Sequence, residues 1–383
     1  MMSAGASDGL QLSFESSLLL PTHATAVTFS SNGKVLAAGS DDGSVRIYHP
    51  PETKVKSALR ALGGSISNLI FNDAEGNDLW IASGKSVLRF DLKDSKLIYN
   101  KSDNLFSKDI GIDDEDVVNQ LALSANHAYL AATTDSGGIY VLDLSSKNVS
   151  SLKMKTSHNS IAWAAAFIPD RSSELITSGY DCSLLLHDFR LGTLLAKIEF
   201  TSLPALAPGI SSLPPFITAV TLSSSGTIAS GTADGRIWIG FGGAKLSTSS
   251  GSGTGKKGKA KKTRKWGGLN EEEGFFTKVS DSLIADLKFV SVDSLIACTV
   301  HGRLSKHRLV FPSSSGSSNK GGLLEEWSTQ ITSYTRIDAL AYNLNEDRIA
   351  TAGLYVDQKR GVVELRSLRA ASTGSVEGSE NAQ

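Results

Sequence analysis

The chain alternates short apolar stretches with polar turns that hold Asn, Asp or Gly. Residues 26–49, AVTFSSNGKVLAAGSDDGSVRIYH, show the pattern: apolar residues alternate with polar ones in VTF and SVRI, and the turns SNG and DDG separate the strands. Period-two alternation predicts half-buried β-strands, and Asn-Gly or Asp-Gly sequences favour tight turns between strands. A similar arrangement returns at 178–190 and at 231–241. The sequence therefore predicts an internal repeat of short strands joined by hairpins.

Seven such units follow one another along the chain. Each combines an apolar first strand, a second strand rich in small residues, and a third strand. They cover residues 26–49, 65–92, 117–144, 160–190, 216–241, 283–309 and 336–368. Repeats of four strands need about 40–45 residues each, so seven of them require about 280–315 residues. The rest of the 383 residues falls in tails and insertions, which leaves no second domain.

The units resemble WD repeats, and the chain resembles a seven-bladed β-propeller over residues 10–369. The motifs are degenerate. The Trp-Asp position of the repeat holds Tyr48-His49, Phe90-Asp91, Leu142-Asp143 and His187-Asp188 in the first four units. The resemblance implies an all-β, single-propeller fold in which residues 10–23 supply the outer strand of the last blade. This closure removes open sheet edges. Residues 1–9 and 370–383 are expected to be disordered tails.

Composition narrows the class of protein. A net charge of -1 excludes a polycation built for nucleic acid, so any basic function must be local. With Cys182 and Cys298 as the only cysteines of the sequence, neither a disulfide framework nor a cysteine-rich zinc site is expected. The first residues lack the regions of a signal peptide, and no apolar run reaches about 18 residues. We expect an intracellular protein of the nucleus, the cytoplasm or both.

Histidine and aspartate residues recur at the turns of the repeats. The pairs are His23 with Asp42 and His158 with Asp181, and Asp234 holds the same turn position in the fifth unit. In WD repeats such residues form a buried hydrogen-bond network, which is the role expected here. A hydrolase triad is the alternative, but the pairs recur in several units and the chain has no GxSxG sequence. Neither a zinc-protease motif nor a cofactor motif is present, so we expect no enzyme.

One segment is strongly basic. Residues 256–266, KKGKAKKTRKW, hold seven cationic residues and no acidic one: Lys256, Lys257, Lys259, Lys261, Lys262, Arg264 and Lys265. The spacing of Gly255-Lys256-Lys257 does not fit a phosphate-binding loop. Ser and Gly flank the segment, which predicts a flexible insertion at 245–268 in the fifth blade. It is a solvated loop, a nuclear-import signal, or a phosphate contact to RNA or chromatin; with Trp266 alone nearby, a base-stacking platform is not supported.

The ending His187-Asp188-Phe189-Arg190 resembles the Trp-Asp-x-Arg ending of WD-repeat substrate receptors of cullin-4 ubiquitin ligases. The resemblance implies that Asp188 holds the blade and that Arg190 points outward to the ligase adaptor, as a planar fork suited to a carboxylate. His187 departs from the pattern, and a blade-closing Asp with a solvated Arg is the alternative. A narrower resemblance to the WD-repeat-containing protein 53 group, associated with the same ligase class, rests on residues 213–239.

These observations predict a non-catalytic interaction scaffold that is monomeric outside its complex. Its partners would be proteins, including the cullin-4 adaptor and substrates of unknown identity. A nuclear scaffold for RNA or chromatin that uses the lysine-rich segment is the second hypothesis. A propeller enzyme is the third, and it would need a set of carboxylates or a metal at the channel mouth.

Overall fold

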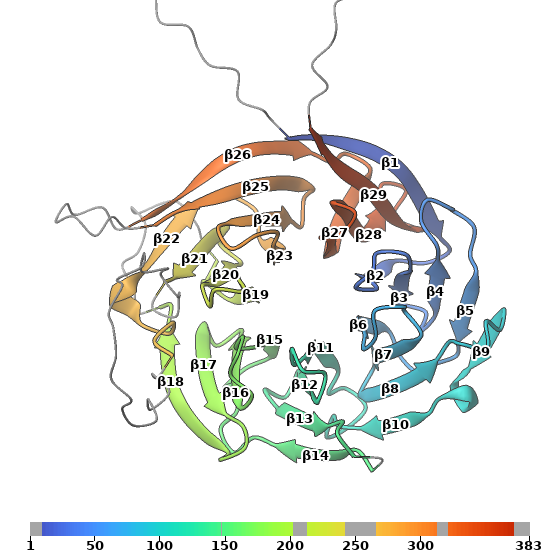
Figure 1. The fold of residues 1–383 in the computed structure, drawn as a ribbon, viewed down its shortest axis with the longest axis horizontal. Helices are drawn as coiled ribbons and strands as arrows, with labels where there is room; N and C mark the ends of the chain where they lie inside the picture. Colours follow the sequence, from blue (N-terminus) through green and yellow to red (C-terminus); the bar gives the residue numbers. More distant parts are fainter. Residues whose placement is uncertain (1–9, 147, 202–212, 242–265, 312–320, 371–383) are drawn as a thin grey trace, which may run out of the picture.

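The computed structural model describes residues 10–146, 148–201, 213–241, 266–311 and 321–370. Seven sheets stand around a central channel as the blades of a β-propeller (Figure 1), which confirms the expected fold class. The helices within these ranges are two three-residue 3-10 turns, η1 (Lys101–Asp103) and η2 (Glu271–Glu273). Over the same ranges, no helix has the length and apolar character needed to cross a membrane.

Each blade is built from strands that follow one another from the channel outward. Blade one has β2 (Ala24–Phe29), β3 (Leu36–Ser40), β4 (Val45–Tyr48) and β5 (Ser57–Arg60). Blade two has β6 (Ile66–Phe71), β7 (Asp78–Ser83), β8 (Ser86–Asp91) and β10 (Phe106–Asp109). Blade three has β11 (Val118–Leu123), β12 (Tyr129–Thr134), β13 (Ile139–Asp143) and β14 (Ser150–Lys153). Blade four has β15 (Ala162–Phe167), β16 (Glu174–Gly179), β17 (Ser183–Asp188) and β18 (Thr193–Glu199).

The remaining blades repeat this order. Blade five has β19 (Ile217–Leu222), β20 (Ile228–Thr232), β21 (Arg236–Gly240) and β22 (Gly274–Lys278). Blade six has β23 (Ile284–Phe289), β24 (Ser294–Thr299), β25 (Arg303–Val310) and β26 (Gly322–Gln330). Blade seven has β27 (Tyr334–Asn343), β28 (Arg348–Tyr355) and β29 (Gly361–Ala370), with β1 (Leu10–Leu20) as its outer strand. All seven units expected from the sequence are blades.

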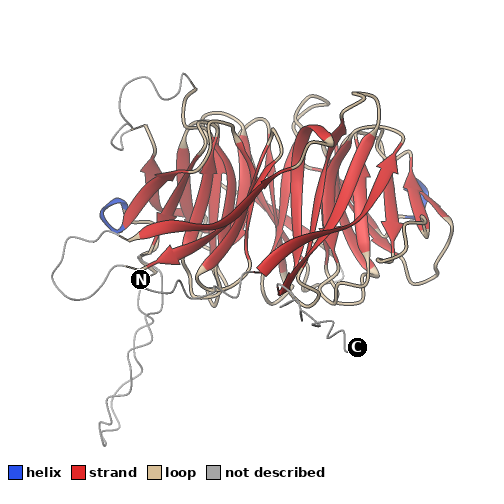
Figure 2. Cartoon of the chain, turned by 90° about the horizontal axis from the view of Figure 1, so that it is seen from above, coloured by secondary structure: helices blue, strands red, loops and turns tan. Residues whose placement is uncertain are grey.

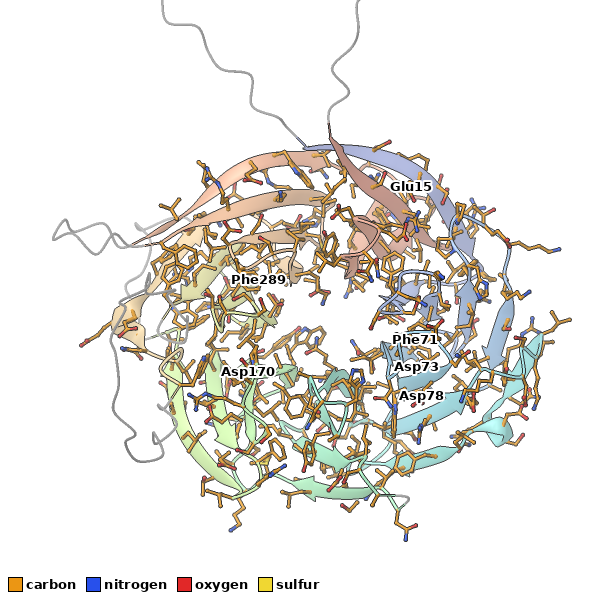
Figure 3. The ribbon with its side chains drawn as sticks, in the orientation of Figure 1. Glu15, Phe71, Asp73, Asp78, Asp170 and Phe289 are labelled. Carbon is orange, nitrogen blue, oxygen red and sulfur yellow. The ribbon has the colours of Figure 1, made fainter. Side chains whose placement is uncertain are left out.

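The N-terminal strand closes the ring. β1 pairs antiparallel with β29, from Leu10 opposite Ala370 to Leu20 opposite Gly361. Glu15 on this strand (Figure 3) accepts a hydrogen bond from Arg348 Nε at 2.7 Å, an ion pair between two half-buried side chains. The two ends of the propeller are thereby held together in one sheet, as the sequence predicts.

Blade one has a fifth strand that the repeat pattern does not predict. β9 (Ile98–Asn100) comes from the connection between β8 and β10 of blade two, and it pairs in parallel with β5. Tyr99 anchors it, because this side chain is 2% exposed and belongs to the core cluster of Leu59 and Leu62. The free energy gained by burying this large aromatic side chain compensates for the few backbone hydrogen bonds of so short a strand.

The innermost strands are joined by side chains at β-bulges. The pairing of the first two strands shifts at one residue in blades one to six and at two in blade seven, and a bulge re-aims the side chain of the extra residue. In four blades this side chain donates to a carbonyl of the next blade: Thr25 to Ile66, Ser67 to Val118, Asn119 to Ala162 and Thr218 to Ile284. Polar residues at this position therefore join blades as well as lining the channel.

Because neighbouring strands run antiparallel, the innermost strand of every blade begins at one face of the ring and ends at the other (Figure 2). The face where innermost strands begin also carries the connections between blades and the turns between second and third strands. We call it the connector face. The other, called the opposite face, carries the turns that follow the third strands.

Candidate functional site

The turn after β17 on the opposite face is the site that the sequence singles out. Asp188 ends the strand, and its Oδ1 accepts hydrogen bonds from the backbone N–H groups of Arg190 and Leu191, each at 3.1 Å. Gly192 follows with φ +64°, a conformation that glycine adopts without strain, and β18 begins at Thr193. The carboxylate of Asp188 therefore fixes the backbone of the turn that presents Arg190.

The side chain of Arg190 lies across the boundary between blades three and four. Its Nη2 donates to the hydroxyl of Tyr129 at 2.9 Å, and its guanidinium carbon is 5.3 Å from the centre of the Tyr129 ring. Phe189 below it is 2% exposed, with its ring 4.9 Å from that of Tyr129 and 5.7 Å from that of Phe167. Arg190 itself remains exposed. The site is thus an anchored turn that holds an exposed cation over an aromatic ring.

The same turn occurs in two other blades. Asp91 Oδ1 accepts from the N–H of Lys93 at 3.0 Å in blade two, and Asp143 Oδ1 accepts from that of Ser145 at 2.9 Å in blade three. Aspartate at this position is therefore part of the blade architecture. What differs from blade to blade is the residue two positions later, which is arginine only in blade four among these three.

On the connector face, the structure brings His158 and Asp181 together. His158 Nδ1 lies 2.9 Å from Asp181 Oδ1, and its Nε2 lies 3.0 Å from the hydroxyl of Thr177. Burial alone would raise the pKa of the Asp181 carboxyl. Hydrogen bonds from His158, Asn159 and Ser183 and the charge of His158 outweigh burial and hold that pKa below its ordinary value. The pair forms a structural network between the blade connection and the next turn.

His187 completes this network at the position where the repeat has tryptophan. Its Nε2 lies 3.4 Å from the Thr177 hydroxyl, and the residue is fully buried. Burial, together with the nearby charge of His158, lowers the pKa of His187 to about 4, so the ring is neutral at pH 7. Its Nδ1 has no hydrogen-bond partner among the described residues.

The expected partnership of His23 with Asp42 is wrong. His23 Nε2 lies 2.6 Å from Asp338 Oδ2 on the innermost strand of blade seven. Asp42 is exposed and accepts hydrogen bonds from the N–H and hydroxyl of Ser44, at 3.0 and 2.5 Å. The reason is that blade seven places a carboxylate nearer to His23, a contact between residues 315 positions apart that no local pattern shows.

Asp234 lies in a buried ion pair of blade five. Its Oδ2 accepts from Arg236 Nε at 2.7 Å, and its Oδ1 accepts from the hydroxyl of Thr232. Its side chain is only 8% exposed. Asp234 thus has a structural environment, but its partner is an arginine rather than a histidine.

The basic residues Lys256, Lys257, Lys259, Lys261, Lys262, Arg264 and Lys265 lie outside the described residues, in the connection between β21 and β22. Trp266 lies just inside. It is 6% exposed and belongs to a core cluster shared by blades four and five, with Ile198 and Trp238. Its ring is therefore not available to stack on a base.

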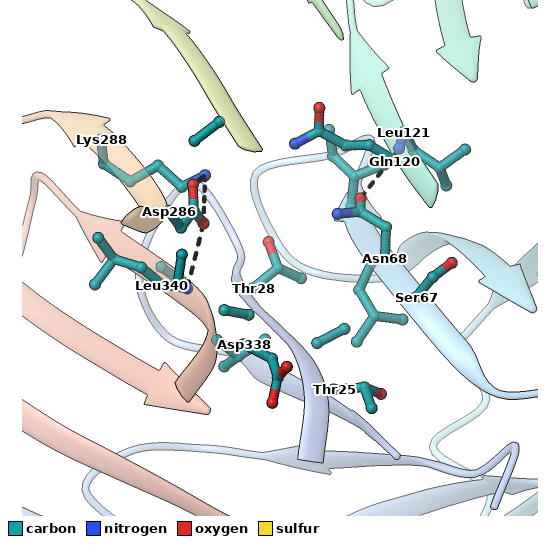
Figure 4. Close-up of a pocket in the computed structure, with 18 of the residues that line it drawn as sticks. Thr25, Thr28, Ser67, Asn68, Gln120, Leu121, Asp286, Lys288, Asp338 and Leu340 are labelled. Carbon is teal, nitrogen blue, oxygen red and sulfur yellow. Dashed lines mark hydrogen bonds and ion pairs between the residues drawn. The ribbon is translucent and has the colours of Figure 1, made fainter. Parts of the chain in front are cut away.

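The central channel holds a cavity of about 250 Å³ lined by the innermost strands (Figure 4). Its charged groups are paired: Asp286 with Lys288 at 3.0 Å, and Asp338 with His23 and Arg336. Asp286 also accepts from the N–H of Leu340 at 3.2 Å and so joins blades six and seven. Within the described ranges, no group of three or more His, Cys, Asp or Glu side chains is placed to hold a metal ion.

Comparisons with known proteins agree with this architecture. Residues 14–49 match the WD40 family model, described as "WD domain, G-beta repeat". The WD repeat-containing protein 53 homolog of Dictyostelium discoideum is 30% identical over 235 residues, which are 56% of this chain. The match spans 61% of that relative's length. This likeness agrees with the narrower resemblance expected from residues 213–239.

Proposed function

We propose that this chain, a WD-repeat β-propeller, is a substrate receptor of a cullin-4 ubiquitin ligase and binds the ligase adaptor through Arg190. WD propellers generally bind other proteins, and theirs is typically a non-catalytic interaction fold. In this proposal the Asp188–Arg190 turn contacts the adaptor, while other surfaces take substrates. The complex would act in the nucleus, the cytoplasm or both.

The observation that carries the proposal is the anchoring of an exposed arginine. Two N–H groups bonded to Asp188 fix the backbone, and the Tyr129 hydroxyl takes one Nη2 hydrogen bond. The guanidinium presents a fork of donors, and holding it in place reduces the conformational entropy lost when a partner binds. A partner carboxylate is the group that this fork fits best.

Exposed apolar side chains lie beside the turn. Leu191, next along the turn, is 69% exposed, and Leu194 on β18 is also exposed. Interfaces gain most of their affinity from a few buried anchors such as arginine and adjoining apolar side chains. We therefore expect an adaptor surface that sets a carboxylate beside apolar residues.

Partner capture tests the proposal. Tagged wild-type chain, Arg190→Glu and Lys93→Glu are expressed in cells, and captured proteins are identified by mass spectrometry. Lys93 is the matched control, because it holds the same position of the same turn in blade two. Loss of one anchoring charge pair typically costs enough to reduce capture by about tenfold or more. The adaptor should accompany wild type and Lys93→Glu but not Arg190→Glu.

Equal capture of the adaptor by all three chains, or by none, would contradict the proposal. Thermal unfolding of Arg190→Glu is the control for folding, since the side chain is exposed and its loss should leave the melting temperature nearly unchanged. The second hypothesis, binding of RNA or chromatin by the lysine-rich segment, rests on residues outside the described ranges and stays a prediction.

A further inference from the structure

Blades five and six offer an internal comparison on the connector face. Their turns read Thr232-Ala233-Asp234-Gly235-Arg236 and Thr299-Val300-His301-Gly302-Arg303. The backbones match: the arginine N–H donates to the threonine hydroxyl oxygen at 3.1 Å in both, and both glycines have positive φ. The one difference in chemistry at these positions is His301 in place of Asp234.

In blade five the aspartate accepts the hydrogen bonds of the arginine side chain. Asp234 Oδ2 accepts from Arg236 Nε and lies 2.7 Å from Nη2, while Oδ1 accepts from the Thr232 hydroxyl. The Arg236 guanidinium is buried and lies 4.3 Å from the centre of the Phe276 ring. An oxyanion bound by threonine and arginine is thus part of the folded blade.

In blade six that oxyanion is missing. His301 turns its Nδ1 to the hydroxyl of Ser282, at 2.8 Å. Arg303 Nε is buried and has no hydrogen-bond partner among the described residues, although Nη2 contacts the carboxylate of Glu325 at 2.8 and 3.0 Å. A buried, unpartnered N–H of a cation is costly and calls for an acceptor.

A pocket of about 630 Å³ opens over this turn. It is lined by Lys278, Val279, Ser280, Asp281, Ser282, Thr299, His301, Arg303 and Gln330. Lys278 and Arg303 give it two cations and Ser280, Ser282 and Thr299 give it hydroxyls. The one acidic residue of the lining, Asp281, pairs with Lys278 Nζ at 3.4 Å through a side chain that is 96% exposed, and Nζ also donates to the carbonyl oxygen of Asp234 at 2.6 Å. The lining therefore suits an anion larger than a single carboxylate.

We propose that this pocket binds a phosphate monoester, carried as a phosphorylated side chain by a partner protein. One phosphate oxygen takes the position that the Asp234 carboxylate has in blade five and accepts from Arg303 Nε. The remaining oxygens face Lys278 and the pocket hydroxyls. A dianionic group with three acceptor oxygens matches this donor set better than a carboxylate does. The pocket lies on the connector face, so it is independent of the Arg190 site.

Replacement of His301 by aspartate tests the site directly. His301→Asp supplies the oxyanion internally, as in blade five, so the melting temperature should rise by about 2–5 °C. Adding about 10 mM inorganic phosphate should raise the melting temperature of wild type but not of His301→Asp. His127→Asp is the control, because it adds the same charge at an exposed histidine on the opposite face. Sodium chloride at matched ionic strength separates binding from screening.

Titration with peptides distinguishes a phosphate ligand from a carboxylate ligand. Wild type is titrated by calorimetry with capped Gly-Gly-phosphoserine-Gly-Gly and with its serine and glutamate counterparts. The phosphopeptide should bind at least about tenfold more tightly than the glutamate peptide, and Arg303→Gln should lose about tenfold or more of that affinity. Arg190→Glu should bind the phosphopeptide as wild type does.

Three results would overturn the proposal. One is phosphate stabilising His301→Asp as much as wild type. Another is equal affinity for the phosphoserine and glutamate peptides. The third is unchanged binding in Arg303→Gln. Because none of these measurements involves the ligase adaptor, failure of this proposal and failure of the Arg190 proposal can be told apart.

Discussion

His158 Nδ1 lies 2.9 Å from Asp181 Oδ1, and this contact ties the connection that leads into blade four to the turn between β16 and β17. The His158 side chain is fully buried and that of Asp181 is 11% exposed. Since Asp181 also accepts from the N–H groups of Asn159 and Ser183, its carboxylate organises three donors.

Asp181→Ala should therefore destabilise the protein by about 2–3 kcal/mol at pH 7, because it leaves a buried imidazole N–H and two backbone N–H groups without their acceptor. Urea unfolding measures the difference. Asp181 has a folded pKa below its unfolded value, so its stabilising contribution is present above the unfolded pKa and disappears as the pH falls through the folded pKa. The difference between wild type and variant should shrink below about pH 4. A constant difference down to pH 3 would contradict the assigned role.

His187 should make stability fall in mildly acid solution. Its pKa is about 4 in the folded chain against 6.5 when unperturbed, so the unfolded chain binds more protons between these values. The free energy of unfolding should decrease by up to about 3 kcal/mol as the pH drops from 7 to 4. In His187→Leu the free energy of unfolding should lose this part of its pH dependence. The pKa of His307 is also lowered, by burial, so its contribution of the same sign remains. Denaturation at several pH values compares the two chains, and parallel slopes would exclude His187 as the source.

Gly235 and Gly192 form a matched pair for backbone strain. Both have positive φ, at +77° and +64°. A Cβ on Gly235 would lie 2.0 Å from the carbonyl oxygen of Ser280, whereas no atom of the described residues lies within 4 Å of one on Gly192. Gly192→Ala should cost about 1–2 kcal/mol from conformation alone. Gly235→Ala adds a backbone clash and should cost at least about 3 kcal/mol or prevent folding. Equal destabilisation in urea would show that the close approach in blade five is relieved without cost.

Tyr129→Phe should loosen Arg190 without disturbing the core. The ring that packs on Phe189 is kept, and only the hydroxyl that accepts from Arg190 Nη2 is removed. Stability should change by less than about 1 kcal/mol, because this hydrogen bond is exposed. Capture of the ligase adaptor should weaken by about threefold to fivefold through the loss of preorganisation. Tyr140→Phe is the control, since its ring lies under Lys153 and not under Arg190.

The pattern of apolar residues and turns predicted most of the fold. Period-two strands separated by turns that hold Asn, Asp or Gly marked the first three strands of all seven blades, because each hairpin is encoded within about 25 consecutive residues. The closing role of residues 10–23 came from the resemblance to the propeller family. β9 escaped prediction because its three residues acquire their place only by burying Tyr99 against blade one.

At the sites, local partnerships were predictable and distant ones were not. His158, just before the fourth unit, and Asp181 within it lie 23 positions apart, and the sequence pairs them correctly. His23 meets Asp338 instead of Asp42, since ring closure brings the last blade beside the first. The position of Arg190 on an exposed turn follows from its motif, but its contact with Tyr129 depends on the packing of blades three and four.

By itself the sequence determined the repeat, the number of blades and the turn residues, because these depend on interactions between near neighbours in the chain. Only the tertiary structure decided which charged side chains have hydrogen-bond partners. Thr299, His301 and Arg303 look like a variant of the Thr232–Arg236 turn in the sequence, yet folding leaves Arg303 Nε buried with no acceptor from the part of the chain that the structure describes. The burial of Arg303 Nε arises only when the blades assemble into the ring. Because this N–H is buried, having His301 where blade five has Asp234 creates a candidate anion site.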